Sequence, residues 1–437
     1  ALGACTAAQN VAVGGAALED CTTGEYNVAV GMEAGRNLTT GSSNTAIGRN
    51  SLDKAVTGDG NTVVGAQAGR DITSGASNTG VGQYACASVT TASYNVAVGD
   101  NALPSNTTGA GNVALGYQTL NQNTTADNNI SIGYQAMQQN TTGTGVAVGP
   151  YALDAQTVGK NNNAFGNNAL TALTTGSNNT ALGHKALFTV TTQIDSVAVG
   201  NFALQLASAN QNVGVGVSAL TATTTGSNNV AVGLRAMMAN TTGASSVAIG
   251  QEALKSVTTG GSNVAVGSAA AFGVTTGENN VVIGRNTVYN NNPSNCVVIG
   301  HSAGGWLNTG ANGTVAIGYQ ALSACTTGSW NTAVGHQALD ACTSGANNNV
   351  GVGASALGLC TGGDRNTAIG SNALQDHTTG GDNTAVGYLA LAENTTGGTN
   401  TAVGSYALDA NTTNSQSTAV GYKALTNNTA ANMTAVG

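Results

Sequence analysis

The sequence predicts an all-β protein, a parallel β-solenoid (β-roll) of about 26 coils with a 17-residue repeat. Three observations carry this prediction. A motif of the type Asn-Thr-Ala-Val-Gly returns along the chain, and the glycines that close it are 16, 17 or 18 residues apart, most often 17. The 30 charged residues, 11 Lys and Arg with 19 Asp and Glu, occupy only six positions of the repeat. A unit this short fits one turn of a parallel β-coil better than a helical hairpin.

The composition supports a thin core and excludes two classes of partner. Glycine accounts for 63 of 437 residues, and charged and aromatic residues for only 7% and 4%. The apolar residues are mostly Ala, Val and Leu, so little bulky material is present to fill a globular core. Disordered chains combine low hydrophobicity with high charge, and this chain has neither, so we expect it to fold. The net charge of −8 and the dispersed Lys and Arg argue against nucleic-acid binding and membrane insertion by this segment.

The repeat predicts a single continuous array over residues 1–437, without a linker. Both ends are cut within the pattern, because Ala1-Leu2 matches the Ala-Leu that follows each motif and Gly437 closes one. Solenoids need caps over their terminal coils, and the sequence has no recognisable cap. We therefore expect a fragment of a longer fibre protein whose caps are missing.

Each coil is numbered here from the glycine that closes the previous motif (the marker glycine), so that position +1 is the residue after it. Charges fall only at +1, +2, +5, +6, +11 and +12. Each of these sites is a pair of neighbours, which a turn can present to solvent and a strand cannot, so we expect three corners. The walls between them are +3 to +4, +7 to +10 and +13 to +16.

The wall at +13 to +16 carries the motif, and strand alternation places +14 and +16 on one face and +15 on the other. We expect the β-branched residues at +14 and +16 to fill the lumen and the alanines at +15 to face outward. An uncharged outward wall of small residues suits close packing on copies of the same chain, so we predict a homo-oligomer, most simply a homotrimer. The alanines concerned are Ala12, Ala29, Ala46, Ala97, Ala114 and their equivalents.

Position +7 gives two candidate ladders. Because this position otherwise holds Leu, Ile or Val, we expect its side chains to point inward. Three interpretations of its cysteines stay open: a ladder of buried thiols, a Cys5–Cys21 disulfide, or a metal site. Stacked asparagines at +7 can hydrogen-bond from coil to coil, although their Asn-Thr-Thr stretches also match glycosylation sequons. The cysteines are Cys5, Cys21, Cys325, Cys342 and Cys360, and the asparagines are Asn106, Asn123, Asn140, Asn394, Asn411 and Asn428.

Nothing in the sequence indicates catalysis, a cofactor or a bound metal. The four histidines lie on distant coils, and three of them are at position +1. The acidic residues form no pair of the kind that hydrolysis requires. Gly-x-Gly patterns belong to the repeat and lack the strand-to-helix context of a nucleotide loop. We therefore expect that the protein is not an enzyme.

Exposed aromatic residues at the corners are the candidate contact surface. Amphipathic rings on a polar surface can bind sugars or protein receptors, and the alternative is packing across a subunit boundary or over a neighbouring coil. The residues are Tyr117, Tyr134, Tyr319, Tyr388 and Tyr422 at +1, with Tyr26, Tyr94 and Trp330 at +12.

The motif resembles the head repeats of trimeric autotransporter adhesins of the YadA type. Ser246-Val247-Ala248-Ile249-Gly250 carries the likeness, and the stretch 314–322, Thr-Val-Ala-Ile-Gly-Tyr-Gln-Ala-Leu, is similar to repeats of phage and marine-microbial fibre proteins. The resemblance implies a trimeric β-roll whose Val and Ile residues fill each coil. It also implies an extracellular fibre on a cell or virion surface that binds a host or matrix receptor, protein or glycan. The adhesin repeat is usually shorter, so the Thr-Thr-Gly wall is a departure.

Two other functions remain open. The first is ice binding by a ladder of threonines at +8, whose hydroxyls would repeat at the coil spacing. Against it, Val56, Ser208, Asn292 and Asn308 interrupt the ladder, and Thr is simply a good strand residue. The second is a self-assembling extracellular filament. The threonines are Thr22, Thr39, Thr73, Thr90, Thr107 and Thr124.

Overall fold

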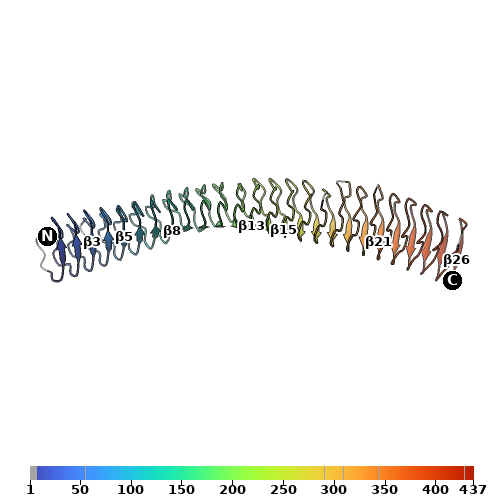
Figure 1. Cartoon of the computed structure of the whole chain (residues 1–437), viewed down its shortest axis with the longest axis horizontal. Helices are drawn as coiled ribbons and strands as arrows, with labels where there is room; N and C mark the ends of the chain where they lie inside the picture. Colours follow the sequence, from blue (N-terminus) through green and yellow to red (C-terminus); the bar gives the residue numbers. More distant parts are fainter. Residues whose placement is uncertain (1–6, 55, 290, 309, 344, 428) are drawn as a thin grey trace. The chain divides into compact units, whose positions relative to one another are not determined.

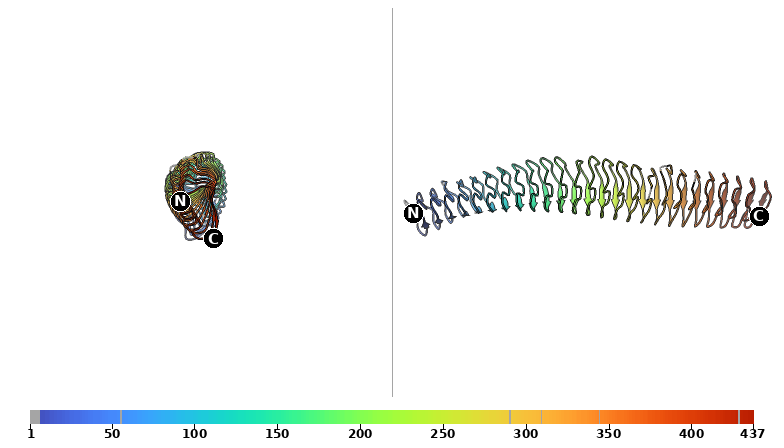
Figure 2. Two further views of the ribbon diagram at one scale, coloured as in Figure 1. Left: turned by 90° about the vertical axis from the view of Figure 1, so that its right-hand side faces the viewer. Right: turned by 45° about the horizontal axis from the view of Figure 1, so that its top comes forward.

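The computed structural model describes residues 7–54, 56–289, 291–308, 310–343, 345–427 and 429–437. They belong to two compact units, Ala1–Asn212 and Val213–Gly437. Each unit is a parallel β-solenoid in which each coil contributes one short strand, and the described residues contain no helix. Within each unit the strands follow one another in chain order along one side of the coils (Figures 1 and 2).

In the N-terminal unit each strand pairs in parallel with the strand of the neighbouring coil. Equivalent residues face each other, as in Val28 with Thr45 and Ala29 with Ala46. The register follows from the motif, because a slip by one residue would exchange the two faces of the strand. The strands are β1 (Val11–Val13), β2 (Val28–Val30), β3 (Thr45–Ile47), β4 (Thr62–Val64), β5 (Thr79–Val81), β6 (Val96–Val98), β7 (Val113–Leu115), β8 (Ile130–Ile132), β9 (Gly145–Val148), β10 (Asn162–Phe165), β11 (Thr180–Leu182) and β12 (Val197–Val199).

The C-terminal unit repeats this arrangement with the same parallel, in-register pairing, as in Ala248 with Ala265. Its strands are β13 (Val213–Val215), β14 (Val230–Val232), β15 (Val247–Ile249), β16 (Val264–Val266), β17 (Val281–Ile283), β18 (Val297–Ile299), β19 (Val315–Ile317), β20 (Thr332–Val334), β21 (Val350–Val352), β22 (Thr367–Ile369), β23 (Thr384–Val386), β24 (Thr401–Val403), β25 (Thr418–Val420) and β26 (Thr434–Val436).

The two faces of this sheet are the reverse of the sequence prediction. The alanines at +15 point inward, and Ala29, Ala46, Ala97 and Ala114 are buried, whereas Ala12 in the first described coil is partly exposed. The residues at +14 and +16 line the outer face, where the valines and isoleucines at +16 are up to about half exposed within the stacked coils. The expectation that Val and Ile fill each coil is therefore wrong.

The narrow lumen explains this reversal. The leucine at +4 reaches across from the opposite wall, and a Cβ placed on Gly35 would lie 3.1 Å from Cδ2 of Leu18 and 3.7 Å from Cβ of Ala29. Leu18 and Ala29 thus border the same space. At close-packed density that space holds one large side chain and one methyl group, so small residues occupy the inner face of the strand.

Positions +4 and +7 share this limited volume. In one coil Leu18 at +4 accompanies the small Cys21 at +7, and in the next coil Gly35 at +4 accompanies Leu38 at +7. The side chains of Leu18, Cys21 and Leu38 are buried. In these two coils a large residue at one position accompanies a small one at the other, whereas in another coil Leu170 and Leu173 are both large and buried.

Only one of the three predicted walls is a strand. The segments at +3 to +4 and +7 to +10 are turns and extended stretches, yet coil-to-coil backbone hydrogen bonds join them, as from Leu103 N to Thr119 O (3.0 Å) and from Thr107 N to Thr124 O (2.9 Å). Residues at +2, +4 and +12 repeatedly adopt positive φ, for example 51° at Leu103. This left-handed backbone bends the chain tightly and breaks the strand geometry.

The marker glycines cannot be replaced by another residue without strain. Gly267 has a φ of 134° and donates its N–H to Ile249 O at 2.8 Å. A Cβ on Gly267 would lie 2.6 Å from the carbonyl oxygen of Gly284, the marker of the next coil. Both the backbone angle and the close stacking of coils therefore demand glycine here.

A buried asparagine ladder at +13, which the sequence interpretation did not single out, joins the coils. The Oδ1 of Asn27 accepts the N–H of Asn44 at 2.9 Å, and Nδ2 of Asn27 donates to Gly41 O at 2.9 Å. Each such amide satisfies backbone groups of the following coil, which is why a polar residue can be buried there. The signal in the sequence was the near-constant Asn immediately before each strand.

Candidate interaction surface

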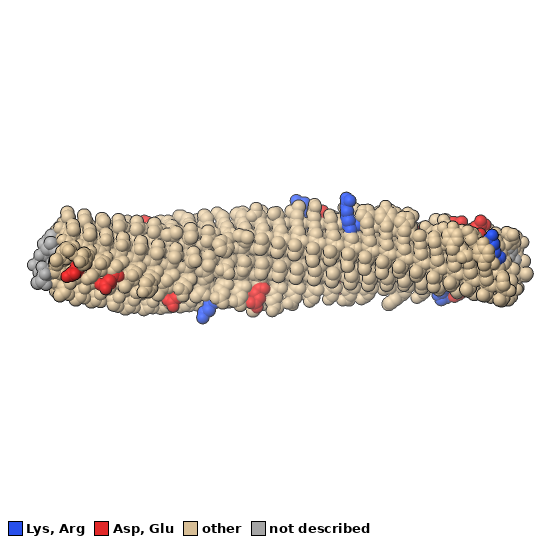
Figure 3. Space-filling model, turned by 90° about the horizontal axis from the view of Figure 1, so that it is seen from below, with Lys and Arg blue, Asp and Glu red and all other residues tan. Residues whose placement is uncertain are grey.

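Charged side chains are few and scattered over the face drawn in Figure 3, and in the sequence they all fall at the corner positions. Several pair with a neighbour, for example Arg365 with Asp382 at 2.7 Å and Lys255 with Glu252 at 2.8 Å. Exposed pairs of this kind contribute little to stability. Among the described residues, no group of three or more His, Cys, Asp and Glu is placed to hold a metal ion, and no helix is long and apolar enough to cross a bilayer.

Three of the predicted cysteines form a buried column on successive coils. The Sγ atoms of Cys325 and Cys342 are 3.2 Å apart, and Cys360 lies on the next coil. The hydrogen bond with Cys325 and burial raise the pKa of Cys342, and burial raises the pKa of Cys360 to about 11. Cys21 is also buried and donates to Gly24 O at 3.6 Å. Cys5 lies outside the described residues, so the Cys5–Cys21 bridge stays a prediction.

The first run of asparagines at +7 is buried and hydrogen-bonded between coils. Nδ2 of Asn123 donates to Oδ1 of Asn106 at 3.1 Å, and Nδ2 of Asn140 donates to Oδ1 of Asn123 at 3.2 Å. All three side chains are buried. Attachment of a glycan would require these amides to leave the core.

The second run contains a polar column with incomplete hydrogen bonding. His377 is buried at +7, its Nε2 lies 2.6 Å from Gly380 O, and burial lowers its pKa. Both amide atoms of Asn394 on the next coil lack a hydrogen-bond partner, while Nδ2 of Asn411 donates to Asn414 O at 3.1 Å. The remaining member, Asn428, lies outside the described residues.

The eight predicted corner aromatics are all exposed. Those at +1 stack on rings of neighbouring coils. The ring centroids of Tyr117 and Tyr134 are 5.4 Å apart, and Tyr319 lies between His301 (5.6 Å) and His336 (5.4 Å). Part of the surface of each of these rings is therefore covered by a ring of a neighbouring coil, and the remainder is exposed to solvent.

Tyr388 and Tyr422 at +1 and Trp330 at +12 also contact neighbouring residues of the coil stack. Tyr388 packs edge-on against Tyr406, with centroids 5.4 Å apart, and Tyr406 lies 6.3 Å from Tyr422. At +12, a Cβ on Gly313 would lie 2.5 Å from Cε3 of Trp330, so the indole covers that glycine. The members not yet placed, Tyr26 and Tyr94, lie at the same corner and are exposed.

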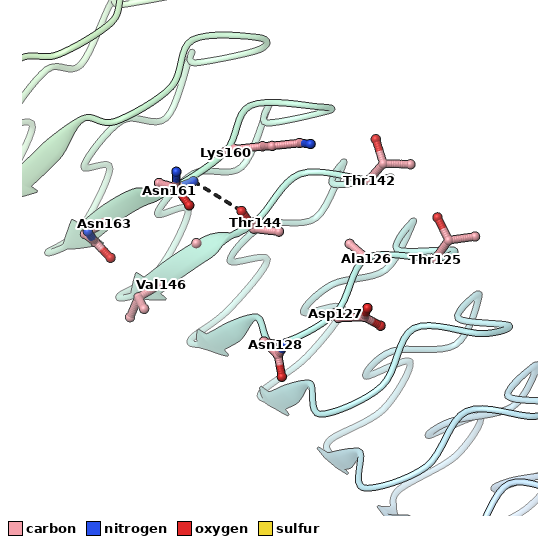
Figure 4. Close-up of a pocket in the computed structure, with 11 residues that line it drawn as sticks. Thr125, Ala126, Asp127, Asn128, Thr142, Thr144, Val146, Lys160, Asn161 and Asn163 are labelled. Carbon is pink, nitrogen blue, oxygen red and sulfur yellow. Dashed lines mark hydrogen bonds between the residues drawn. The ribbon is translucent and has the colours of Figure 1, made fainter.

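A notch of about 690 Å³ opens in the N-terminal unit where one coil is short (Figure 4). The coil from Gly133 to Gly149 has 16 residues, so its third corner lacks a residue. Gly145 occupies the place of the ladder asparagine, and a Cβ there would overlap the backbone oxygen of Asn162. The shortened corner thus lies below the corners of its two neighbours.

The notch presents polar groups of several kinds. Asp127 lies on one rim and accepts the N–H of Ala110 at 2.7 Å, and Lys160 lies on the opposite rim. The N–H of Asn161 donates to Oγ1 of Thr144 on the floor at 3.2 Å (Figure 4). One carboxylate, one ammonium group, amides and hydroxyls in contact with solvent form a polar contact surface. They do not form a nucleophile with a positioned base.

Three smaller hollows share the second corner, at +5 and +6, and sequence reasoning missed them. Each occurs where the residue at +5 is small: Gly305 (about 340 Å³), Gly358 (about 170 Å³) and Ala87 (about 350 Å³). The hollow at Gly305 is lined by Tyr289 and Trp306. The available signal was a glycine or alanine at +5 where the preceding coil carries a larger side chain, namely Arg70, Tyr289 or Asp340.

The threonines at +8 use their hydroxyl groups within the solenoid. Oγ1 of Thr22 donates to Thr39 O at 2.9 Å, and Oγ1 of Thr107 donates to Thr124 O at 3.0 Å. These donors join neighbouring coils, although Thr22 remains exposed and Thr107 is half-buried.

No protein-family model matches the chain, and no similar protein was found among curated sequences.

Proposed function

We propose that the protein is a structural, non-catalytic fibre module that projects from a cell or virion surface and engages a host or matrix receptor through its corners. The observation that carries the proposal is the contrast between walls and corners. The Asn ladder, the marker glycines and the inner alanines recur from coil to coil, whereas the charged residues, the hollows and most of the aromatic rings lie at the corners. Recurring walls suit spacing, and variable corners suit recognition.

The unequal coil lengths support the same division. The 16-residue coil from Gly133 to Gly149 keeps its strand in register with both neighbours, although the missing residue reshapes a corner and leaves Gly145 in the place of a ladder asparagine. Surface loops tolerate such changes because they carry few packing contacts. The corners can therefore vary in shape without loss of the stacked walls.

We infer that copies of the chain assemble through the outer face of the sheet, now lined by Val, Ile and Thr in place of the predicted alanines. Positions +14 and +16 hold no charged residue in any coil. Exposed apolar surface that recurs along consecutive coils is typical of an interface, and a stable interface covers about 800 Å² per partner. A homotrimer about a common axis, which the YadA resemblance implies, would cover this face in every subunit.

Two measurements test the proposal. Light scattering of the purified chain is expected to give three times the chain mass of 42.5 kDa. Beads coated with the protein are expected to attach to epithelial cells or to matrix proteins more than beads coated with albumin. A monomeric chain would refute the assembly, and beads that attach to neither surface would refute the receptor-engaging role.

The two alternatives have their own tests. Ice binding by the threonines at +8 has little support, since their hydroxyls donate within the protein, and thermal hysteresis of the purified chain would reinstate it. A self-assembling filament would show end-to-end contacts between purified particles in electron micrographs.

A further inference from the structure

We propose that the hollow at Gly305 binds a pyranose ring of a neutral glycan. This inference rests on the proposed receptor-engaging role and specifies the ligand class of one site. It starts from a stack of side chains at position +5 of consecutive coils. Lys255 Nζ lies 5.0 Å from the ring centroid of Phe272, and the rings of Phe272 and Tyr289 stack with centroids 4.9 Å apart and an interplanar angle of 13°.

The stack stops at Gly305, which occupies +5 of the next coil and has no side chain. One face of the Tyr289 ring packs on Phe272, so the opposite face is directed toward the vacant position. The following coil returns with Ser323 at +5, two coil spacings beyond Tyr289, or roughly 9.6 Å. One flat ring fits between them and would continue the stack.

The walls of the hollow fit a sugar ring. Tyr289 is 37% exposed and Trp306 is 56% exposed, so both rings are accessible to a ligand. Aromatic faces bind the apolar C–H face of a pyranose. The hydroxyls of Ser302 and Ser323 and the amide of Gln320 also line the hollow, and these uncharged groups suit sugar hydroxyls. No charged residue lines it, which favours a neutral glycan over a sialylated or sulfated one.

A second hollow in the same unit serves as an internal comparison. At Gly358 the corner, the glycine and the serine at +2 (Ser355) recur, but Asp340 stands in place of Tyr289 and Leu359 in place of Trp306. Its volume is about 170 Å³, half that at Gly305. The glycine alone therefore makes a hollow, and the two aromatic rings give the Gly305 hollow its capacity for sugars.

The test uses the full chain and exploits the presence of only two tryptophans. In the Trp330→Phe variant, Trp306 is the sole indole and reports on its own hollow. Cellopentaose, maltopentaose, chitopentaose and N-acetyllactosamine are titrated while indole fluorescence is followed, with sialyllactose and a hyaluronan tetrasaccharide as anionic probes. At least one neutral probe is expected to give a saturable change, and the anionic probes at least tenfold weaker binding.

Trp306→Ala and Tyr289→Ala are expected to weaken binding at least tenfold by calorimetry, because both rings are exposed and their loss leaves the fold intact. Trp330→Ala and Leu359→Ala are the matched controls and are expected to bind as the parent does. Absence of binding by every neutral probe, preference for an anionic probe, or unchanged affinity in Trp306→Ala would each overturn the inference. Such a result would leave the mass and bead-attachment measurements of the fibre proposal unaffected, so the two failures are distinguishable.

Discussion

Replacement of one marker glycine, Gly267→Ala, is expected to destabilise the C-terminal unit around that coil. The backbone there has a φ of 134°, a region that residues with a Cβ rarely adopt, which costs about 1 to 3 kcal/mol. The new Cβ would also lie 2.6 Å from the carbonyl oxygen of Gly284. Relief requires the two coils to separate, which weakens the hydrogen bond from Gly284 N to Val266 O (2.8 Å) at a further cost of about 1 kcal/mol.

The sum, about 2 to 4 kcal/mol, corresponds to a local opening equilibrium raised by roughly 30-fold or more. Long repeat arrays need not unfold in one step, so the effect is best measured locally. Native-state hydrogen exchange followed by mass spectrometry should show faster exchange in peptides that cover the coils on either side of Gly267, with distant coils unchanged.

Gly310→Ala is the matched control in the same unit. Its φ is not positive, and a Cβ there would lie 3.5 Å from Thr327 O, an ordinary contact. This variant should exchange like the parent protein. If Gly267→Ala exchanged no faster than Gly310→Ala, the argument that stacked glycine backbones set the coil spacing would be refuted.

Four further outcomes are expected. Asn366→Ala leaves Gly380 O and the N–H of Asn383 without the amide that now contacts each at 3.0 Å. Native-state hydrogen exchange around these coils should show the local opening free energy lowered by about 2 to 5 kcal/mol, against little change for Ser371→Ala. Burial lowers the pKa of His377 in the folded protein. As the pH falls below about 6.5, the unfolded state therefore binds a proton first, and the stability of the folded state decreases. His377→Asn should remove this part of the decrease, and identical profiles of stability against pH for the two proteins would contradict the burial. Cys360, with a pKa of about 11, should resist a disulfide-exchange reagent at pH 8 until urea is added, and fast native reaction would contradict its position. Ile249→Glu, at an exposed site on the outer sheet face, should reduce the mass in light scattering to that of one chain, whereas Gln251→Glu at the adjacent corner should not.

Much of the fold could be predicted because charge reports on burial. The six positions that carry all charged residues are indeed on the outside, and the three-residue strands fall on the motif. Which strand residues point into the lumen could not be predicted in the same way. Val96 and Val98 have high β-propensity on either face, and only the volume taken by leucines from the opposite wall decides that Ala97 turns inward.

The candidate site was predictable only in part. Exposure of Tyr319 follows from its corner position, but its place between two histidine rings depends on the residues 18 before and 17 after it. The hollow beside Trp306 depends on the absence of a side chain at Gly305 and on a stack that begins three coils earlier, at Lys255. Such features depend on residues that stack on different coils, and the local sequence of one coil does not predict them.

The asparagine ladder also has weak points with a mechanical consequence. Ser246 takes the place of an asparagine, and its Oγ accepts the N–H of Asn263 at 3.1 Å while donating to Ala244 O at 3.3 Å. A serine has no amide group to reach the carbonyl of the following coil as Asn27 does. Under tension along the stacking direction, the coils on either side of Ser246 should separate before their neighbours, so a single residue sets the point at which the stack opens first.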